Sequence, residues 1–364
     1  MNYFIGDNFS HHAAHSGYMR LVSYIAGEKI FESEKPPLFS TLIKRLFVRR
    51  SGMLWYDAQS FVLELTAALK GVEKKHKIFH FLYGEDNYRY LGSIPWMKDN
   101  FIVATFHTPP AKFQRGMRYT NHLKNLRAAI IVSNYQRKIL ESVVSPERIH
   151  FIPHGIDTDF FRPAVKTSKI CEWEICLCVG HHMRDLPTLC EAARLVSGKR
   201  PKVKFILVDS AFFTASFFSL DNAKTEDIRR SYLRQFEEIA NFEFKSEIDE
   251  ASLLDLYQKS DLLVLPLYDA TANNSLLEAM ACGLPAVVSD VGGIRDYVDE
   301  SCAILVPPQD ASKMAERILG ILEERKKLDR LGQESRRRAL SFSWPLIAKQ
   351  VNQVYESILA KNGS

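Results

Sequence analysis

The stretch that decides the fold runs from residue 268 to residue 293 and reads YDATANNSLLEAMACGLPAVVSDVGG. Small residues lead into a short apolar helix that carries one carboxylate, Glu278. A Gly-Leu-Pro turn and a hydrophobic strand follow, and a second glycine pair ends the stretch. This succession is typical of a parallel α/β sheet, whose loops at the carboxyl edge bind ligands.

The same alternation continues along the chain, where short apolar runs predict buried parallel strands separated by amphipathic helices. These strands are expected at 77–84, 101–107, 128–133, 174–180, 203–209, 261–267 and 285–290. A chain of 364 residues suits two domains rather than one. We therefore predict two Rossmann-like, doubly wound α/β domains, at 1–160 and 165–340, that face each other across a cleft. An amphipathic helix within 341–364 could pack back on the first domain.

The composition is that of a soluble globular protein, with 46% hydrophobic and 25% charged residues. No run of about 18 apolar residues predicts a membrane span, and the first residues lack the features of a signal peptide. The six cysteines form no C-x-x-C pair and lie in apolar surroundings, which favours free thiols in a reducing compartment. We expect a cytoplasmic protein.

Charge is unevenly distributed between the halves. Residues 1–162 contain 22 Lys and Arg against 14 Asp and Glu, whereas the remainder contains 26 against 29. A basic first domain predicts an anionic partner, and nucleic acid, an anionic lipid surface and a phosphorylated substrate all remain open. Within it, LFSTLIKRLFVRR at 38–50 has apolar residues at helical spacing interspersed with four basic residues. It could lie on an anionic membrane, or it could be a core helix with a solvated basic face.

The loop before Glu278 predicts an anion site. A helix N-terminus offers free N–H groups and the positive end of a dipole, and Asn274 and Ser275 are expected to cap this helix. Glu278, about one turn inside, could accept two hydrogen bonds from a vicinal diol such as a ribose. The alternative is a core helix whose carboxylate is solvated, and spacing alone leaves both interpretations open.

The segment NNSLLEAMACGLPAVVSDVGGIRDYV resembles the signature region of retaining GT-B glycosyltransferases of family 4. Further motifs of that family follow the same order along the chain. They are ATFHTPP (104–110), IVSNYQRKIL (131–140), FIPHGIDTDFFRP (151–163), LCVGHHMRDLPTLCEAARLV (177–196) and FSWPLIAKQVNQVYESIL (342–359). The resemblance covers nearly the whole chain from about residue 100 and implies a GT-B fold.

The resemblance also implies roles for the donor site. Glu278 matches the acid that binds the donor ribose, and the backbone around Asn274, Ser275 and Leu276 matches the segment that holds the diphosphate. Arg184 lies near the family's lysine that neutralises the leaving phosphate, a task for which a guanidinium is suited. From the residues alone, Arg184 could instead be a surface charge flanking a helix.

In the first domain, His107 matches a histidine that contacts the transferred sugar, although a structural imidazole is the alternative. The Ser16-Gly17 turn, with Arg20 near it, is expected to form the first loop of the cleft, where backbone can approach a ligand.

One departure from the family concerns the donor sugar. The family has a second glutamate eight residues before Glu278, and here that position is Ala270. Asp269 is adjacent but one residue out of phase. The sugar would then be held by Asn273 or Asn274, by backbone or by the other domain.

No metal or other cofactor is expected. His11, His12 and His15 have a spacing that permits zinc, but no Cys or Asp/Glu cluster accompanies them. The DTD run at 157–159 has the Asp-x-Asp form that can hold a divalent ion against a diphosphate, but it lies where the family has a turn. Positive groups and a helix dipole can neutralise the diphosphate without a metal ion.

The sequence thus predicts a metal-independent glycosyltransferase. It would move a sugar from a nucleotide-diphosphate donor, such as UDP-glucose, to a hydroxyl of a glycan or lipid-linked acceptor, with retention, in polysaccharide or cell-envelope glycan synthesis. Contact with the inner face of an anionic membrane is possible. A nucleotide-sugar epimerase or a phosphorylase on the same fold, and a degenerate nucleotide- or glycan-binding protein, are the alternatives. A nucleic-acid binder is disfavoured because no aromatic module accompanies the basic residues.

Overall fold

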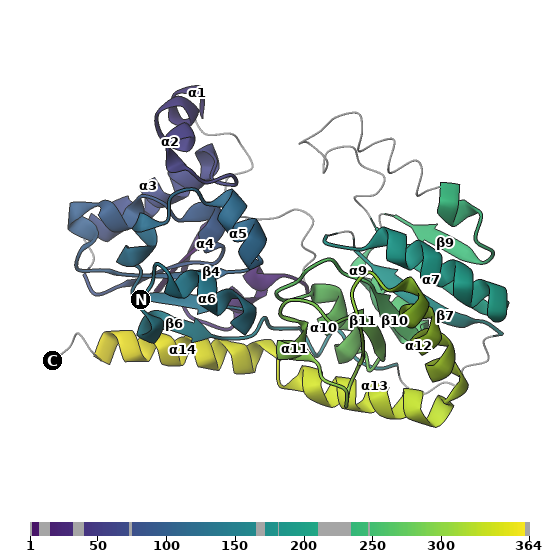
Figure 1. The fold of residues 1–364 in the computed structure, drawn as a ribbon. Helices are drawn as coiled ribbons and strands as arrows, with labels where there is room; N and C mark the ends of the chain where they lie inside the picture. Colours follow the sequence, from purple (N-terminus) through teal and green to yellow (C-terminus); the bar gives the residue numbers. More distant parts are fainter. Residues whose placement is uncertain are drawn as a thin grey trace. The chain divides into compact units, whose positions relative to one another are not determined.

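A computed structural model of the chain describes residues 2–6, 15–31, 40–72, 75–164, 172–180, 182–209, 234–246 and 248–360. The chain divides into two compact units (Figure 1). Unit 1 comprises Met1–Gly155 and Phe342–Ser364, and unit 2 comprises Ile156–Ser341.

Unit 1 contains a parallel sheet with the order β2-β1-β3-β4-β5-β6 among the described strands. The central strand β4, FIVATF, is buried at every residue, as expected for a parallel strand covered on both faces. The order reverses direction between β1 and β3, which makes their carboxyl ends a topological switch point. The strands are β1 Asn2–Gly6, β2 Glu28–Phe31, β3 Ile78–Phe81, β4 Phe101–Phe106, β5 Ala128–Ile131 and β6 Ile149–Phe151.

The helices of unit 1 include the C-terminal helix α14. Its first residue, Trp344, lies against the rings of Tyr18 and His154, with ring centroids 5.6 and 5.3 Å away. The α-helices are α1 Ser40–Ile43, α2 Arg49–Ser51, α3 Ala58–Val72, α4 Gly84–Asn87, α5 Pro110–Gly116, α6 Arg137–Glu141 and α14 Trp344–Ala360. A π-helical turn, η2 Lys44–Val48, joins α1 to α2, and short 3-10 turns are η1 Tyr18–Ser23, η3 Leu91–Ser93, η4 Pro95–Met97, η5 Asn121–Asn125, η6 Asn134–Gln136 and η7 Pro146–Arg148.

Unit 2 contains a second parallel sheet, with the order β12-β11-β10-β7-β8-β9. This is the Rossmann order, and its switch point lies between β7 and β10. The strands are β7 Glu174–Val179, β8 Val203–Val208, β9 Phe242–Lys245, β10 Leu262–Leu265, β11 Ala286–Ser289 and β12 Ile304–Val306. The helices are α7 Leu186–Lys199, α9 Glu250–Lys259, α10 Asn274–Ala281, α11 Ile294–Tyr297, α12 Ala311–Glu323 and α13 Arg325–Leu340.

Two parallel, doubly wound sheets confirm the predicted α/β fold class. Side chains at the helix starts explain several boundaries in unit 2, because Asp185, Asp249 and Asp310 each accept a hydrogen bond from the backbone of the first turn. No helix among the described residues is long and apolar enough to span a membrane.

Candidate active site

The residues predicted to bind the donor lie at the switch point of unit 2. The loop after β7 and the loop after β10 leave the sheet there and are bonded to each other. The Tyr268 N–H donates to the Met183 carbonyl, and the Asp185 N–H donates to the Pro266 carbonyl, both at 3.0 Å. The two loops therefore form one connected surface where open α/β sheets bind ligands.

Arg184 is buried within this surface. Its Nε donates to the Val179 carbonyl and its Nη1 to the His182 carbonyl, both at 3.0 Å. Its Nη2 donates to the Ser275 Oγ at 2.7 Å. Burial lowers the pKa of the guanidinium, which nevertheless stays charged. Arg184 is thus a fixed buried cation at the start of α10 rather than a surface charge.

The cap of α10 differs from the prediction by one residue. Asn273, not Asn274 or Ser275, is the N-cap, because its backbone is extended while Asn274 is already helical. Its Oδ1 accepts hydrogen bonds from the Leu276 N–H at 3.1 Å and from the Ser275 hydroxyl at 2.8 Å. Ser275 therefore connects the Arg184 guanidinium to the cap, and three residues predicted for donor binding lie together.

Glu278 is buried, so the interpretation of a solvated carboxylate is wrong. Its Oε2 accepts a hydrogen bond from the Tyr257 hydroxyl of α9 at 2.8 Å. Burial and this neighbouring carboxylate raise the pKa of Tyr257 well above its usual value, so the phenol keeps its proton. A ribose that bound Glu278 would share the carboxylate with Tyr257.

The loop around Ala270 is supported by the second glycine pair. The Gly293 N–H donates to the Ala270 carbonyl at 2.8 Å. Gly292 has φ +51°, and a Cβ there would lie 2.2 Å from the Ala270 carbonyl oxygen. Asp269 accepts the Ala270 N–H at 2.8 Å, and burial raises the pKa of its carboxyl. Asp269 thus braces its own loop.

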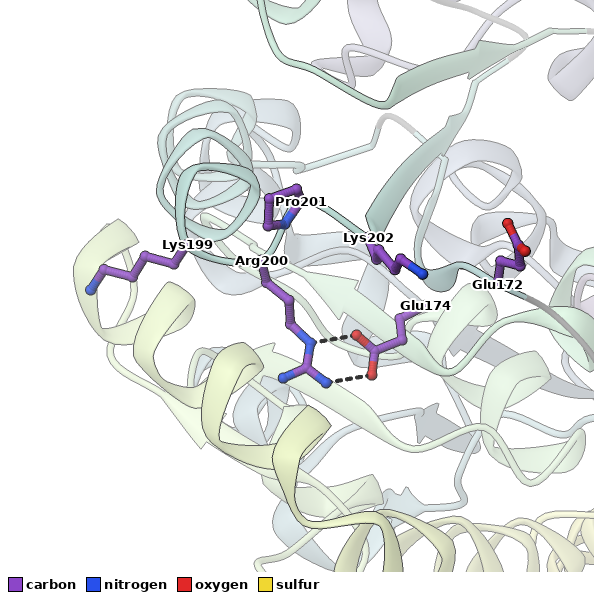
Figure 2. Close-up of a pocket in the computed structure, with 6 residues that line it drawn as sticks. All are labelled: Glu172, Glu174, Lys199, Arg200, Pro201 and Lys202. Atoms are coloured by element: carbon purple, nitrogen blue, oxygen red, sulfur yellow. Dashed lines mark hydrogen bonds and ion pairs between the residues drawn. The ribbon is translucent and has the colours of Figure 1, made fainter.

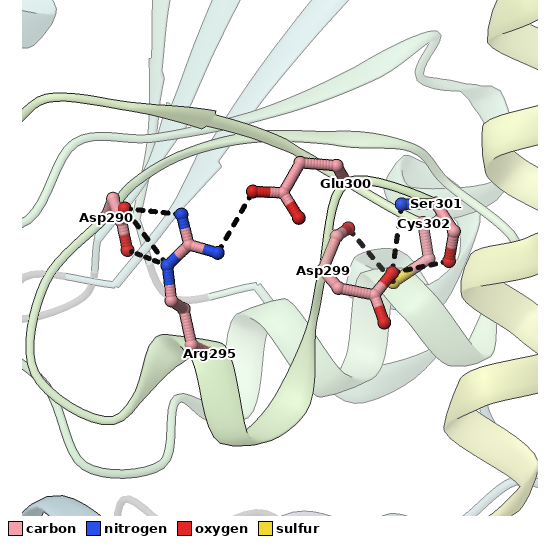
Figure 3. Close-up of polar contacts among 6 residues, drawn as sticks. All are labelled: Asp290, Arg295, Asp299, Glu300, Ser301 and Cys302. Carbon is pink, nitrogen blue, oxygen red and sulfur yellow. Dashed lines mark hydrogen bonds and ion pairs between the residues drawn. The ribbon is translucent and has the colours of Figure 1, made fainter.

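A surface ion-pair cluster flanks the glycine pair in the sequence. Arg295 lies between Asp290 and Glu300 (Figure 3). Its Nε is 2.9 Å from Asp290 Oδ1 and its Nη2 is 2.8 Å from Asp290 Oδ2. These side chains are half exposed or more, apart from Asp290, so the pairing adds little stability to the turn. No sequence pattern other than the charges themselves indicated this pairing.

His107 follows β4 at the carboxyl edge of the sheet in unit 1. Its Nε2 donates to the Leu82 carbonyl at 2.9 Å. A carbonyl can only accept, so this bond fixes the Nε2–H tautomer of the neutral ring and makes Nδ1 its acceptor atom. Burial lowers the pKa of His107 to about 4, so the ring is neutral at pH 7.

The Ser16-Gly17 turn lies beside His107. Gly17 has φ +86° and immediately precedes Tyr18. The Tyr18 ring meets His107 edge-on at 4.7 Å and His154 at 5.4 Å between centroids. The structure therefore brings together the residues predicted for unit 1. His11 and His12 lie outside the described residues.

Glu85 is a candidate site residue that sequence reasoning missed. It is buried on α4, and its Oε1 accepts the His107 N–H and the Thr108 hydroxyl, both at 2.7 Å. Its Oε2 is buried and has no partner among the described residues. Desolvation raises the pKa of this carboxyl. A carboxylate directly after the strand predicted at 77–84 was a signal that could have identified it.

A buried chain of hydrogen bonds connects α14 to the same edge. Tyr355 Oη lies 2.5 Å from His80 Nδ1, and His80 Nε2 lies 2.8 Å from Thr105 Oγ1. Thr105 Oγ1 in turn donates to Tyr18 Oη at 3.3 Å. Burial lowers the pKa of His80 to about 3. This chain anchors Tyr18, and so the Gly17 turn, to the C-terminal helix.

Two other features do not contribute to the candidate site. A hollow of about 450 Å³ lies at the amino ends of β7 and β8 (Figure 2), where Arg200 donates to both oxygens of Glu174. In the DTD run, Asp157 is buried and accepts the N–H groups of Asp159 and Phe160 at 3.2 and 3.1 Å, which is a turn. Within the described part of the chain, His, Cys, Asp and Glu form no group of three that could hold a metal ion.

Two family models match the chain. Residues 174–338 match "Glycosyl transferases group 1", and residues 53–160 match "Glycosyltransferase Family 4". Similar proteins include the MMP alpha-(1->4)-mannosyltransferase of Mycolicibacterium hassiacum, 27% identical over 61% of this chain and 52% of that protein. The D-inositol 3-phosphate glycosyltransferase of Geodermatophilus obscurus is 25% identical over 77% and 67%. The phosphatidyl-myo-inositol mannosyltransferase of Mycolicibacterium smegmatis is 26% identical over 71% and 65%. The chain thus spans about half to two thirds of the length of these relatives.

Solved structures agree on the fold. Sucrose-phosphate synthase from Thermosynechococcus elongatus matches with a TM-score of 0.70 and 18% identity over 100% of both chains. HepE from Anabaena, in complex with UDP-glucose, matches with a TM-score of 0.70 and 16% identity over 98% of this chain and 100% of that one. These matches confirm the GT-B fold of two Rossmann-like domains. Beyond the fold, residues 174–338 and 53–160 are each similar to a glycosyltransferase family model.

Proposed function

From a GT-B fold whose two halves both match glycosyltransferase models, we propose that the protein transfers a sugar from a nucleotide-diphosphate donor to a hydroxyl of a glycan or lipid-linked acceptor. Unit 2 binds the donor and unit 1 the acceptor. The observation that carries the proposal is the bond from Arg184 to Ser275, which fixes a buried cation at the start of α10. A buried cation beside a helix N-terminus is suited to a diphosphate.

In this proposal, the diphosphate binds at the N-terminus of α10, with the backbone of Asn274, Ser275 and Leu276 around it. The Arg184 Nη2 transfers its hydrogen bond from the Ser275 hydroxyl to a phosphate oxygen. Glu278 accepts the ribose hydroxyls beside Tyr257. Because a guanidinium and a helix dipole neutralise the developing charge, the reaction proceeds without a metal ion or other cofactor.

Transfer with retention then needs no protein base. The acceptor hydroxyl attacks the anomeric carbon on the face that the leaving group departs from, and the bond from that carbon to the phosphate oxygen breaks. The departing phosphate oxygen takes the acceptor proton, and the nucleoside diphosphate leaves. His107, as a neutral ring, positions the sugar through Nδ1 rather than by proton transfer.

The proposal also names a donor base, a first donor sugar to test and the site of action. We take uridine as the base, and glucose as a first sugar to test, since a protein of the same fold was solved with UDP-glucose. The reaction would serve polysaccharide or cell-envelope glycan synthesis from the cytoplasmic side.

Asn273 would contact the sugar through its amide N–H groups, because its Oδ1 is engaged in the helix cap.

A donor screen that follows UDP or GDP release, with EDTA present, tests the function. We expect release that depends on acceptor, persists in EDTA and falls at least about a hundredfold in Glu278→Ala, while calorimetry shows weaker UDP binding. UDP binding without release from any donor–acceptor pair would instead favour a degenerate binder, the alternative that Ala270 supports. Acceptor-independent formation of an isomeric nucleotide sugar would indicate an epimerase.

A further inference from the structure

We propose that unit 1 docks on an anionic lipid bilayer through an exposed apolar and basic surface. The surface consists of the helical segment 40–51, one stripe of α3 and the side chain of Trp96, and we call it the docking surface. The proposal goes beyond the transferase function and rests on the docking surface alone.

The helical segment 40–51 contributes apolar and basic side chains together. Leu42 and Leu46, one turn apart, are 53% and 39% exposed. Its basic residues are all exposed and form no ion pair with any described residue; they are Lys44, Arg45, Arg49 and Arg50. Residues 40–56 contain no Asp or Glu that would offset these charges.

The stripe on α3 adds three exposed apolar side chains. Leu65, Leu69 and Val72 are 47%, 63% and 57% exposed. Their spacing places them on one side of the helix. Single exposed apolar residues are ordinary on protein surfaces, but an aligned series on one helix is not explained by the fold.

Contacts join the two helices and Trp96 into one surface. The Phe47 ring stacks on Phe61, one turn before Leu65, with centroids 4.0 Å apart. At the other end of the stripe, Trp96 donates its indole N–H to the Ala68 carbonyl at 3.0 Å while its ring stays half exposed. Figure 1 shows α1 and α2 at one extremity of unit 1, beside α3.

The same contacts resolve the two interpretations of segment 38–50. Val48 packs against the core, and the Phe47 ring contacts Phe61 and Tyr90, so one side of the helix is structural. Leu42 and Leu46 remain outside that packing, together with the basic residues. The segment is therefore neither wholly a core helix nor a detached amphipathic one. Residues 38 and 39 lie outside the described part of the chain.

Charge selects an anionic bilayer over a second copy of the chain. A symmetric dimer through this surface would place four cations against the same four cations of its partner, which repel. Anionic headgroups attract them, each Lys or Arg near such a surface strengthening binding about fivefold. The long basic side chains can extend to the headgroups while the leucines enter the acyl boundary.

Vesicle co-sedimentation of the full chain tests the proposal. Wild type should bind vesicles of phosphatidylcholine with phosphatidylglycerol, and not phosphatidylcholine alone, with binding that weakens as salt rises. Arg45→Glu with Arg49→Glu should weaken binding at least about thirtyfold. Leu42→Ser with Leu46→Ser should weaken it too. The matched controls on α13, Lys326→Glu with Arg330→Glu and Leu340→Ser, should bind as wild type.

Trp96 gives a second readout that a general loss of folding would not produce. Anionic vesicles should shift tryptophan emission to the blue in wild type, and Trp96→Phe should remove the shift while the thermal midpoint stays unchanged. Three results would overturn the proposal: no vesicle binding, equal losses in the α13 controls, or self-association of wild type through this surface without lipid binding. None of them bears on nucleotide release, so the transferase function stands or fails separately.

Discussion

Replacing Arg184 tests whether the buried guanidinium does chemistry or only holds two loops together. Its fork donates to Val179, His182 and Ser275 at once, so it serves a structural and, by our proposal, a catalytic task. Loss of one preorganised donor to a developing charge typically costs about 2.7–4 kcal/mol of barrier. We therefore expect Arg184→Ala to lower kcat for UDP release by about a hundredfold to a thousandfold.

Lysine at the same position separates charge from geometry. Arg184→Lys keeps a cation but loses the planar fork whose three nitrogens together bond Val179, His182 and Ser275. We expect Arg184→Lys to retain about ten times more activity than Arg184→Ala. Ser275→Ala removes one acceptor from the charged guanidinium and should cost about 1.5–3 kcal/mol in stability.

Stability must be measured beside the rate. Arg184→Ala leaves the buried Val179 carbonyl without this donor, at a cost of about 1–3 kcal/mol, which corresponds to roughly 2–4 °C per kcal/mol in a unit of this size. Arg200→Ala is the matched control, because Arg200 pairs with Glu174 at the opposite edge of the sheet. Our reasoning is refuted if Arg184→Ala keeps the wild-type kcat, or if both alanine variants lose rate only in proportion to their lost stability.

Three further predictions concern the parts around this cation. Gly292→Ala should lower the thermal midpoint of unit 2 and weaken donor binding, because its Cβ would collide with the Ala270 carbonyl; normal affinity by calorimetry would contradict this. Glu85→Ala should lower kcat at least about tenfold by releasing the His107 turn, with UDP affinity in unit 2 unchanged; a loss of UDP affinity would contradict the assignment. The pKa of His107 is held below its unfolded value, to about 4, so the folded state binds fewer protons. The His107 contribution to stability should be complete above about pH 6.5 and fall by about 1.4 kcal/mol per unit down to pH 4, and buried His80 adds a fall of its own over this range, while kcat shows no histidine limb near pH 6.5; midpoints against pH, compared with those of His107→Asn, and a rate profile check both.

The sheets and their switch-point loops were predictable because their signals are local. Near-continuous apolar runs mark buried parallel strands, and the loops that follow them carry the ligand residues. Ser275 was predicted from its place at a helix start after a buried strand, whereas Arg184 was predicted only from the resemblance to the family's motifs. The cap was placed one residue late because the cap residue is defined by its backbone angles, which a pattern of Asn and Ser does not resolve.

Other features depend on contacts between distant residues, and no local pattern contains them. The bond from Tyr257 to Glu278 joins two helices, and it decides that the carboxylate is buried rather than solvated. In segment 38–50 apolar residues occur on more than one side, so the sequence could not say that Phe47 would be covered and Leu42 exposed. Glu85 did have a local signal, its place after a buried strand, and was missed because no family motif marks it.

The two parts of the donor site should differ in selectivity. In the proposed nucleotide site, Arg184, Ser275 and Asn273 already form one chain of hydrogen bonds, so binding there should cost little further ordering. The sugar part has a buried Ala270 where the family has a carboxylate, and Asp269 is engaged by its own loop. A site that hydrogen-bonds a particular hydroxyl rejects sugars lacking it, whereas a site without that group discriminates less. We therefore expect strict choice of nucleotide and weak discrimination among hexoses, so that kcat/KM for UDP-glucose and UDP-galactose differs by less than about tenfold. A difference above about a thousandfold would show that another group has replaced the missing acid.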